Sequence, residues 1–214
     1  MYDVQKIVLS IVPLLFAIIL HEVSHGWVAE KLGDPTARLL GRITLNPISH
    51  VDLIGTIIVP GILLLTGSHF LFGWAKPVPV NFANLRGGRR DMALVAFSGP
   101  LSNFVLAVLS SIIFHLTFVG ATGSEGIFDG IIVPIHIMAS YSVLFNLVLM
   151  AVNLFPILPL DGGRIVAGLA PVRVAMTMER MERYGMLIVL LLIASGIWSY
   201  VVGPVIYLFW QILM

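Results

Sequence analysis

Residues 4–30 read VQKIVLSIVPLLFAIILHEVSHGWVAE, and this stretch decides the class of protein. It is long enough to cross the roughly 30 Å hydrocarbon core of a bilayer as a helix, and its polar residues are crowded into the second half. His21, Glu22 and His25 lie in that half. Since the stretch also lacks a small-residue cleavage site, we expect a permanent transmembrane helix that carries functional groups, not a removable signal.

The composition of the whole chain supports a membrane protein. Of its 214 residues 58% are hydrophobic and 11% are charged, against about 25% charged residues in a soluble domain. We therefore predict an all-α polytopic membrane protein, organised as one domain over residues 1–214. Further apolar segments, numbered two to five, are expected at about Leu53–Gly73, Met92–Val119, Ile131–Phe155 and Met186–Met214. The last of these follows an amphipathic piece around Ile165–Met181 and should bend at Gly203–Pro204.

The net charge is +1, and no Lys or Arg cluster is larger than the Arg89–Arg90 pair, so the chain shows no basic surface for nucleic acid. Cysteine is absent, which excludes disulfides and thiolate metal sites. The sequence therefore indicates two kinds of partner: the lipid bilayer, and molecules that can reach the polar groups inside it. The oligomeric state cannot be read from the sequence.

The distribution of Lys and Arg predicts the orientation in the cell membrane. Eleven of the twelve basic residues lie in the stretches 31–50, 76–90 and 164–183, and the connection 120–130 has none. Because cytoplasmic loops are enriched in Lys and Arg, these three stretches should face the cytoplasm. A full crossing by segment two would place residues 76–90 outside, so we expect that segment to enter the membrane and return, with Pro60–Gly61 near the turn.

Two stretches between segments one and three have an extended pattern. Arg38–Leu45 (RLLGRITL) is rich in apolar and β-branched residues, and Trp74–Phe82 (WAKPVPVNF) has a proline at every second position near its centre. The second pattern is compatible with an edge strand or a polyproline-like loop. A short β element between segments one and three is therefore expected.

The pentapeptide HEVSH is the strongest chemical motif in the chain. His21 and His25 are four residues apart, so on a helix they share one face and can bind one metal ion. Glu22 lies beside that face, where a carboxylate can hold a water molecule. The alternative is that the histidines are packed, hydrogen-bonded residues and Glu22 faces a polar seam between helices.

A catalytic zinc site with two histidines needs a third protein ligand. His115, His136 and Asp161 are the candidates at a suitable depth, and Asp161 is favoured because NLFPILPLDGG breaks a helix with two prolines and two glycines. By the orientation argument it lies at the cytoplasmic end of segment four, level with His21 and His25. The competing interpretation of Asp161 is an N-cap on the next helix. His115 and His136 should be packed or interfacial.

HEVSHG, followed far downstream by NLFPILPLDGG, resembles the site-2 protease family of intramembrane zinc metalloproteases, whose signature is HExxH plus NxxPxxxxDG. The stretches GRITLNP, GWAKPVPVN and SGPLSN are similar to its small prokaryotic members, so the resemblance covers nearly the whole chain. It implies one Zn²⁺ bound by His21, His25 and Asp161, with Glu22 as general base. It also implies a catalytic core of segments one, three and four. We expect a form without a PDZ or CBS regulatory domain, which departs from many members of the family.

The expected reaction is hydrolysis of peptide bonds in or near transmembrane segments of membrane proteins. Asn153 can donate a hydrogen bond to the oxyanion or to the substrate backbone, or else make a polar contact between helices. For Asn103 and Asn146 the contact between helices is favoured. A helical substrate must unwind to be cut, and the edge of Trp74–Phe82 is a hypothetical place for it to pair.

Two other functions fit parts of the sequence. A metal permease, or a non-catalytic membrane metal-binding protein, would use the same ligands but would not need Glu22 as a base. A membrane protease of the CAAX-processing type would take a glutamate as its third ligand. Four glutamates follow HEVSH in the chain: Glu30, Glu125, Glu179 and Glu182. Each suits the role of third ligand less well than Asp161.

Overall fold

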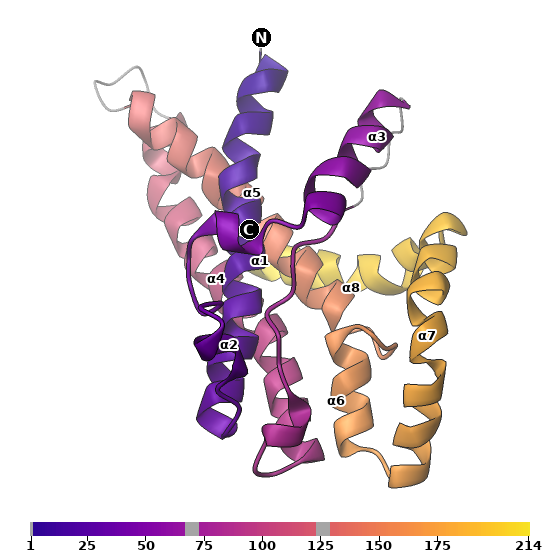
Figure 1. Ribbon diagram of the computed structural model, residues 1–214. Coiled ribbons are helices and arrows are strands. Elements are labelled where there is room, and N and C mark those ends of the chain that lie inside the picture. The colour runs from indigo at the N-terminus through magenta and orange to yellow at the C-terminus, as the bar shows by residue number, and fades with distance from the viewer. Residues whose placement is uncertain (1, 67–72, 123–128) are drawn as a thin grey trace.

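The computed structural model describes residues 2–66, 73–122 and 129–214 (Figure 1). These residues form a helical molecule, as expected. Three of its helices are long and apolar enough to cross a membrane, over Gln5–Leu32, Arg89–Phe118 and Gly130–Asn153. The α-helices are α1 (Tyr2–Leu32), α2 (Thr36–Leu39), α3 (Val59–Leu65), α4 (Arg89–Thr122), α5 (Asp129–Asn153), α6 (Asp161–Leu169), α7 (Val172–Ala194) and α8 (Ile197–Leu213).

Helices α1, α4 and α5 pack against one another and form the core, which confirms the three-helix arrangement of segments one, three and four. Small residues allow the close contact: Ala17, Ala107 and Ala139 are buried between the helices. Many large apolar side chains point outward instead, among them Phe16 and Leu116. This inverted pattern is that of a protein whose surroundings are the hydrocarbon tails of a lipid bilayer.

Segment two forms a single π-helical stretch (Leu53–Ile58) that continues into α3. The Trp74 N–H donates to the Gly55 carbonyl (3.1 Å), so the chain returns to the level at which it left. Gly55 is required there, because a Cβ would lie 2.3 Å from the Trp74 indole. The Pro60–Gly61 pair lies inside α3, so the chain does not turn at that pair; residues 67–72 of the segment lie outside the described part.

The β element expected between segments one and three is not formed among the described residues. Arg38 and Leu39 belong to the short helix α2, and the stretch from Trp74 to Asn81 runs without helix or strand. Pro77 and Pro79 have no N–H to donate to a strand ladder. The N–H of Val78 is used by the Glu22 side chain instead.

Segment five is bent, but at a different residue from the one expected. Helices α7 and α8 meet at Gly196 with an angle of 83° between them. Gly196 has φ 75°, a left-handed conformation that glycine adopts without steric cost. Gly203 and Pro204 lie within α8, and the helix continues through them. Helix α8 packs its Phe209 and Trp210 against the α4–α5 pair.

Candidate metal centre

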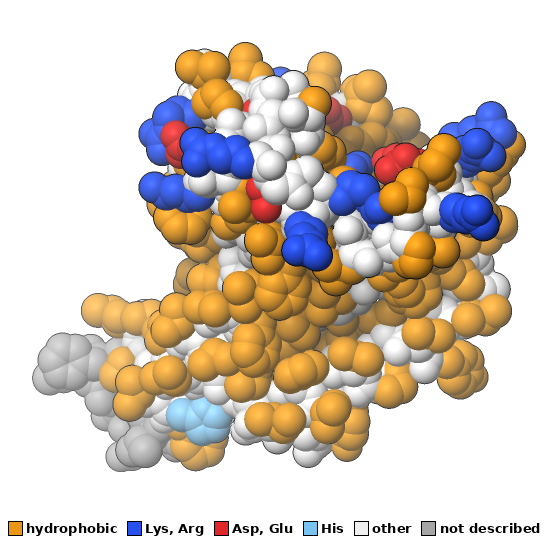
Figure 2. All heavy atoms as spheres, turned by 90° about the horizontal axis from the view of Figure 1, so that it is seen from below, with side chains coloured by type: hydrophobic (Ala, Val, Ile, Leu, Met, Phe, Trp, Pro, Cys, Tyr) orange, Lys and Arg blue, Asp and Glu red, His pale blue; other side chains and the backbone are white. Residues whose placement is uncertain are grey.

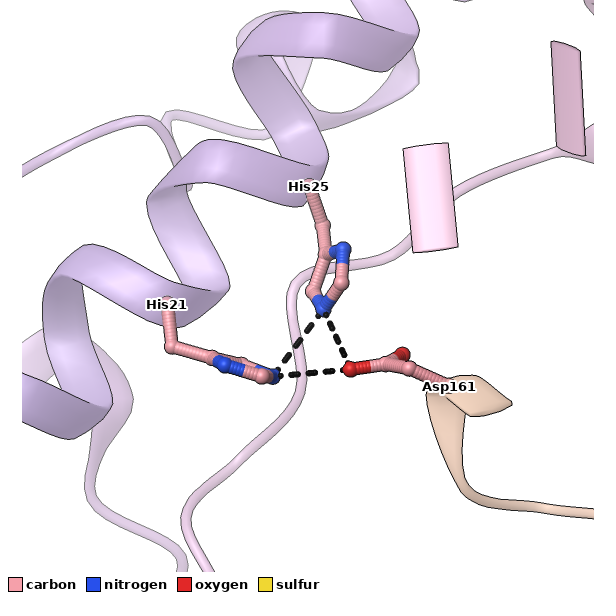
Figure 3. A group of neighbouring side chains, drawn as sticks. All are labelled: His21, His25 and Asp161. Carbon is pink, nitrogen blue, oxygen red and sulfur yellow. Dashed lines mark hydrogen bonds and ion pairs between the residues drawn. The ribbon is translucent and has the colours of Figure 1, made fainter. Parts of the chain in front are cut away.

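The two histidines of HEVSH lie one turn apart on the same face of α1, as the spacing predicts (Figure 3). Their Nε2 atoms are 3.1 Å apart and point toward the same space. Gly99 of α4 faces the rings from the neighbouring helix, and a Cβ there would lie 2.5 Å from His25 Nε2. The absence of a side chain at position 99 therefore provides the room that the rings occupy.

Asp161 joins the two histidines from the other end of the chain (Figure 3). Its Oδ2 lies 3.1 Å from His21 Nε2 and 3.3 Å from His25 Nε2. Asp161 is the first residue of α6, whose N-cap is Leu160, so the N-cap interpretation of Asp161 is wrong. Gly162 allows this placement, because a Cβ on it would lie 2.2 Å from the Leu154 carbonyl oxygen. The end of α5 and the start of α6 can therefore fold tightly against each other.

The opposite ring nitrogens of both histidines are hydrogen-bonded to oxygen. His25 Nδ1 donates to the backbone carbonyl of Val95 at 2.8 Å, and His21 Nδ1 lies 2.6 Å from Oδ1 of Asn103. A hydrogen on Nδ1 leaves a lone pair on Nε2 of a neutral imidazole. The two Nε2 lone pairs thus point at each other and at a carboxylate oxygen.

This donor set fits a metal ion. Three electron-pair donors converge on one point, and the buried Oδ2 of Asp161 has no hydrogen-bond donor. Without a cation or a proton this arrangement is electrostatically unfavourable. Ligands at about 2.0 Å from a tetrahedral zinc are roughly 3.3 Å from one another, which matches the spacing here. Two histidines, one carboxylate and an open fourth position are typical of catalytic zinc.

Glu22 lies beside this cluster, where its Oε2 accepts a hydrogen bond of 2.7 Å from the Val78 N–H. Together with Glu22, the side chains of His21, His25 and Asp161 line a cleft of about 740 Å³. Its opposite walls come from the extended stretch, from α6 and from α7, and include Trp74, Phe82 and Met186. Asn153 also lines the cleft, and its Nδ2 donates to the Leu149 carbonyl at 3.0 Å.

The other polar candidates are placed elsewhere. His136 stacks on Phe114 with 4.1 Å between ring centroids, and His115 Nδ1 donates to the carbonyl of Ser111. Both are packed and neither joins the metal centre, as expected. Asn103 and Asn146 do link α4 to α5, through a hydrogen bond of 2.8 Å. The contact of Asn103 with His21 was not expected, because the sequence does not show which of several membrane asparagines faces a ligand.

The candidate metal centre lies at a similar distance from the ends of three helices at one end of the molecule. His25 is seven residues before the end of α1, Asp161 eight before the end of α6, and Val95 six after the start of α4. At 1.5 Å per residue these positions are about 9 to 12 Å from the helix ends. The end of α1 carries Lys31 and the start of α4 carries Arg89, and Figure 2 shows Lys and Arg grouped on this face of the molecule beside a broad hydrophobic surface.

The comparisons with known proteins agree with this geometry. The chain is 37% identical over 203 residues to "Putative zinc metalloprotease YwhC" of Bacillus subtilis, covering 95% of this chain and 88% of that protein. It is 26% identical over 193 residues to "Putative zinc metalloprotease Rip2" of Mycolicibacterium smegmatis, covering 88% and 67%. The Mycobacterium tuberculosis protein with the same name is 30% identical over 72% of this chain and 54% of its own length.

No family model matches the chain, and no solved structure matches it significantly. The assignment therefore depends on the curated relatives. The match to the Bacillus protein extends over 95% of this chain, so it is not confined to one motif. Together with the two motifs that meet at the metal centre, this similarity establishes that the chain is a zinc metalloprotease and belongs to the site-2 protease family.

Proposed function

We propose that this protein is an intramembrane protease that hydrolyses peptide bonds in or near transmembrane segments of membrane proteins. Its location would be the plasma membrane, with the active site towards the cytoplasm. The observation that carries the proposal is the depth of the candidate metal centre, about 10 Å inside the ends of three helices, of which those of α1 and α4 carry basic residues. A soluble peptide in the cytoplasm would not meet a site at that depth, whereas a membrane segment would.

In this proposal His21, His25 and Asp161 hold the zinc ion. A zinc ion bound there supplies Lewis acidity, which lowers the pKa of a water molecule to about 7 and polarises the scissile carbonyl. The remaining steps belong to the protein. The two imidazoles and the carboxylate come from distant parts of the chain. Helices α1 and α6 must therefore be held in fixed relative positions for the centre to form.

Glu22 is the proposed general base. Its Oε2 is held by the Val78 N–H, which leaves Oε1 to accept the proton of the attacking water and to return it to the leaving amide nitrogen. Asn153 is the second proposed catalytic group. One hydrogen of its amide is used by the Leu149 carbonyl, and the other can be donated to the oxyanion or to a substrate carbonyl in the cleft.

The proposed substrate is a transmembrane segment that has locally unwound. An intact helix hides each peptide bond within its own turns, and the groups freed by unwinding need partners where bulk water is absent. The cleft supports this proposal, because the extended stretch forms one of its walls. Substrate pairing along this wall stays a hypothesis, and the N–H groups of Lys76 and Val78 already have partners.

The test uses purified protein in lipid nanodiscs with a tagged transmembrane peptide whose cleavage site lies within the membrane. We expect Glu22→Gln to keep one zinc per chain and to lower the cleavage rate by roughly 10²- to 10⁴-fold, because only proton transfer is lost. Asp161→Ala should lose both zinc and cleavage. Glu30→Gln is the matched control, since Glu30 is on the same helix and pairs with Arg38 outside the cleft.

Three outcomes would contradict the proposal. Undiminished cleavage by Glu22→Gln would exclude Glu22 as the base. Cleavage of a water-soluble peptide by the wild type, with none of the membrane-embedded peptide, would retain the metalloprotease and reject its action within the membrane. Zinc flux into vesicles without any proteolysis would favour the permease.

A further inference from the structure

Three buried polar side chains from three different helices meet directly behind the metal centre. They are His21 of α1, Asn103 of α4 and Asn146 of α5, with exposed fractions of 7%, 0% and 1%. Polar groups at this depth are costly unless all of their hydrogen bonds are made. His21 is a proposed metal ligand, so the question is what Asn103 and Asn146 do to it.

Backbone carbonyls fix the orientation of both amides. Asn146 Nδ2 donates to the Ser142 carbonyl at 2.8 Å, so Oδ1 of Asn146 is the atom that faces Asn103. Asn103 Nδ2 donates one hydrogen to this Oδ1 and the other to the Ala17 carbonyl at 3.1 Å. Since a carbonyl oxygen only accepts, neither amide can be turned around without placing acceptors against acceptors.

The remaining atom of Asn103 faces His21. With both amide hydrogens used, Oδ1 is left as an acceptor at 2.6 Å from His21 Nδ1. The hydrogen of a neutral His21 must therefore be on Nδ1, and the Nε2 lone pair is directed at the point where Asp161 Oδ2 and His25 Nε2 converge. The Val95 carbonyl accepts the Nδ1 hydrogen of His25 and fixes its tautomer in the same way. Because this acceptor is a backbone atom, no substitution removes it.

We propose that Asn103 is a positioning residue that fixes the tautomer and ring orientation of His21 for metal binding. This inference rests on the proposed role of His21 as a zinc ligand. The competing explanation is a contact between helices that holds the bundle together and would act on stability alone. The two differ in what happens to His21, because only the positioning role requires an acceptor opposite Nδ1.

Three variants separate these explanations. Asn103→Leu is similar in size and removes the acceptor. Asn103→Asp retains an acceptor oxygen opposite His21, and in its protonated form its second oxygen donates to one of the two oxygens that Asn103 Nδ2 serves, those of Ala17 and Asn146. Ser111→Ala is the matched control, because it deletes a buried hydrogen bond on the same helix, from Ser111 to the Leu213 carbonyl, without touching His21.

Two quantities are measured for each variant in nanodiscs at pH 8. The first is zinc affinity by competition with a chelating dye, for which we expect Asn103→Leu to be 10- to 100-fold weaker and the other two variants to stay within about threefold of wild type. The second is the tautomer of His21 in zinc-free protein, by ¹⁵N NMR of labelled histidine. His21 should carry its hydrogen on Nδ1 in wild type and Asn103→Asp, and be mixed in Asn103→Leu.

Each result has one meaning. Wild-type affinity and an unchanged tautomer in Asn103→Leu would overturn the positioning role, as would an equal loss of affinity in Ser111→Ala. If Asn103→Leu does not fold, an altered His21 tautomer or weakened zinc binding in Asn103→Asp overturns it. A wild-type protein that binds no zinc would instead overturn the proposed metal centre, while the tautomer measurement still tests the contact of Asn103 with His21.

Discussion

Gly99 is the residue at which a single methyl group should disable the metal centre. A Cβ at this position would lie 2.5 Å from His25 Nε2 and 2.6 Å from His21 Cε1, and helix α4 cannot withdraw because it packs against both α1 and α5. We expect Gly99→Ala to displace both rings and to weaken zinc binding roughly 5- to 150-fold, since overpacking typically costs about 1–3 kcal/mol. Zinc titration of the purified variant measures this.

Gly203→Ala is the control for this prediction, because a Cβ at position 203 meets no atom within 4 Å. That variant should bind zinc as the wild type does. Equal zinc affinity in Gly99→Ala and Gly203→Ala would mean that the rings can move aside without losing their ligand geometry.

Asp34 should make stability depend on pH at the end of α1. It is fully buried, and its carboxylate accepts hydrogen bonds from the Thr36 hydroxyl and N–H, the Asn84 side chain and the Asn81 N–H. Burial alone would raise the pKa of this carboxyl, but the hydrogen bonds, with Thr36 first, hold the pKa below its ordinary value of 3.8. The stabilisation is therefore complete above pH 3.8 and is lost as the pH falls through the lowered pKa.

Asp34→Asn tests this dependence, because the amide cannot ionise and offers one acceptor in place of two. At pH 6 we expect the variant to be less stable by about 1–3 kcal/mol, the cost of leaving a buried donor unpaired. Unfolding followed in detergent at pH 6 and below pH 3 measures the difference, which should shrink on acidification. A difference that stays constant with pH would contradict the role of the ionised carboxylate.

At the scale of the element, hydropathy was sufficient to predict the bounds of the spanning helices but not the structure of the segments between them. Helices α1, α4 and α5 begin and end within three residues of the expected segments, because their boundaries coincide with changes in polarity. The bend of segment five falls at Gly196 and not at Gly203–Pro204. Both sites carry glycine, and the choice depends on how α8 packs on α4 and α5, which a local pattern does not contain.

The convergence of His21, His25 and Asp161 was predictable, since spacing and residue type indicate it, whereas the contact of Asn103 with His21 was not. Likewise, the proline pattern of the extended stretch indicated its lack of helix but not its partners. The Val78 N–H bonds to Glu22, and the Asn81 N–H bonds to Asp34. These contacts join distant parts of the chain. Through the first of them, the extended stretch holds the Glu22 side chain in place.

Val78→Pro should therefore lower turnover without removing zinc. The substitution deletes the N–H that holds Glu22. The chain at this position lies between two prolines and belongs to no helix or strand, so a third proline breaks no regular element. We expect kcat to fall roughly 10- to 100-fold with unchanged zinc content, since a misplaced catalytic group costs about that much. Val80→Pro is the matched control; an equal loss of kcat in both would indicate general disruption.

At the scale of the whole molecule, the basic residues and the metal centre define one end. Lys31 lies in the last turn of α1, Arg89 begins α4, and Arg173 lies in the first turn of α7. These three helix ends lie at the same end of the molecule in Figure 1, and Figure 2 shows Lys and Arg side chains on that face. Helix α5 begins at Asp129, at the opposite end of the molecule, and the connection that precedes it has no Lys or Arg. This asymmetry predicts that the end with the metal centre faces the cytoplasm.

The orientation can be measured directly, because the chain has no cysteine and any introduced thiol is unique. Leu39→Cys and Val172→Cys place a thiol at the basic end, where both native side chains are exposed. Gly130→Cys places one at the opposite end, on an exposed residue. In intact cells a membrane-impermeant maleimide should label position 130 alone, and positions 39 and 172 should react only after permeabilisation. Labelling of 39 and 172 in intact cells, with 130 protected, would reverse the orientation and place the catalytic cleft toward the outside.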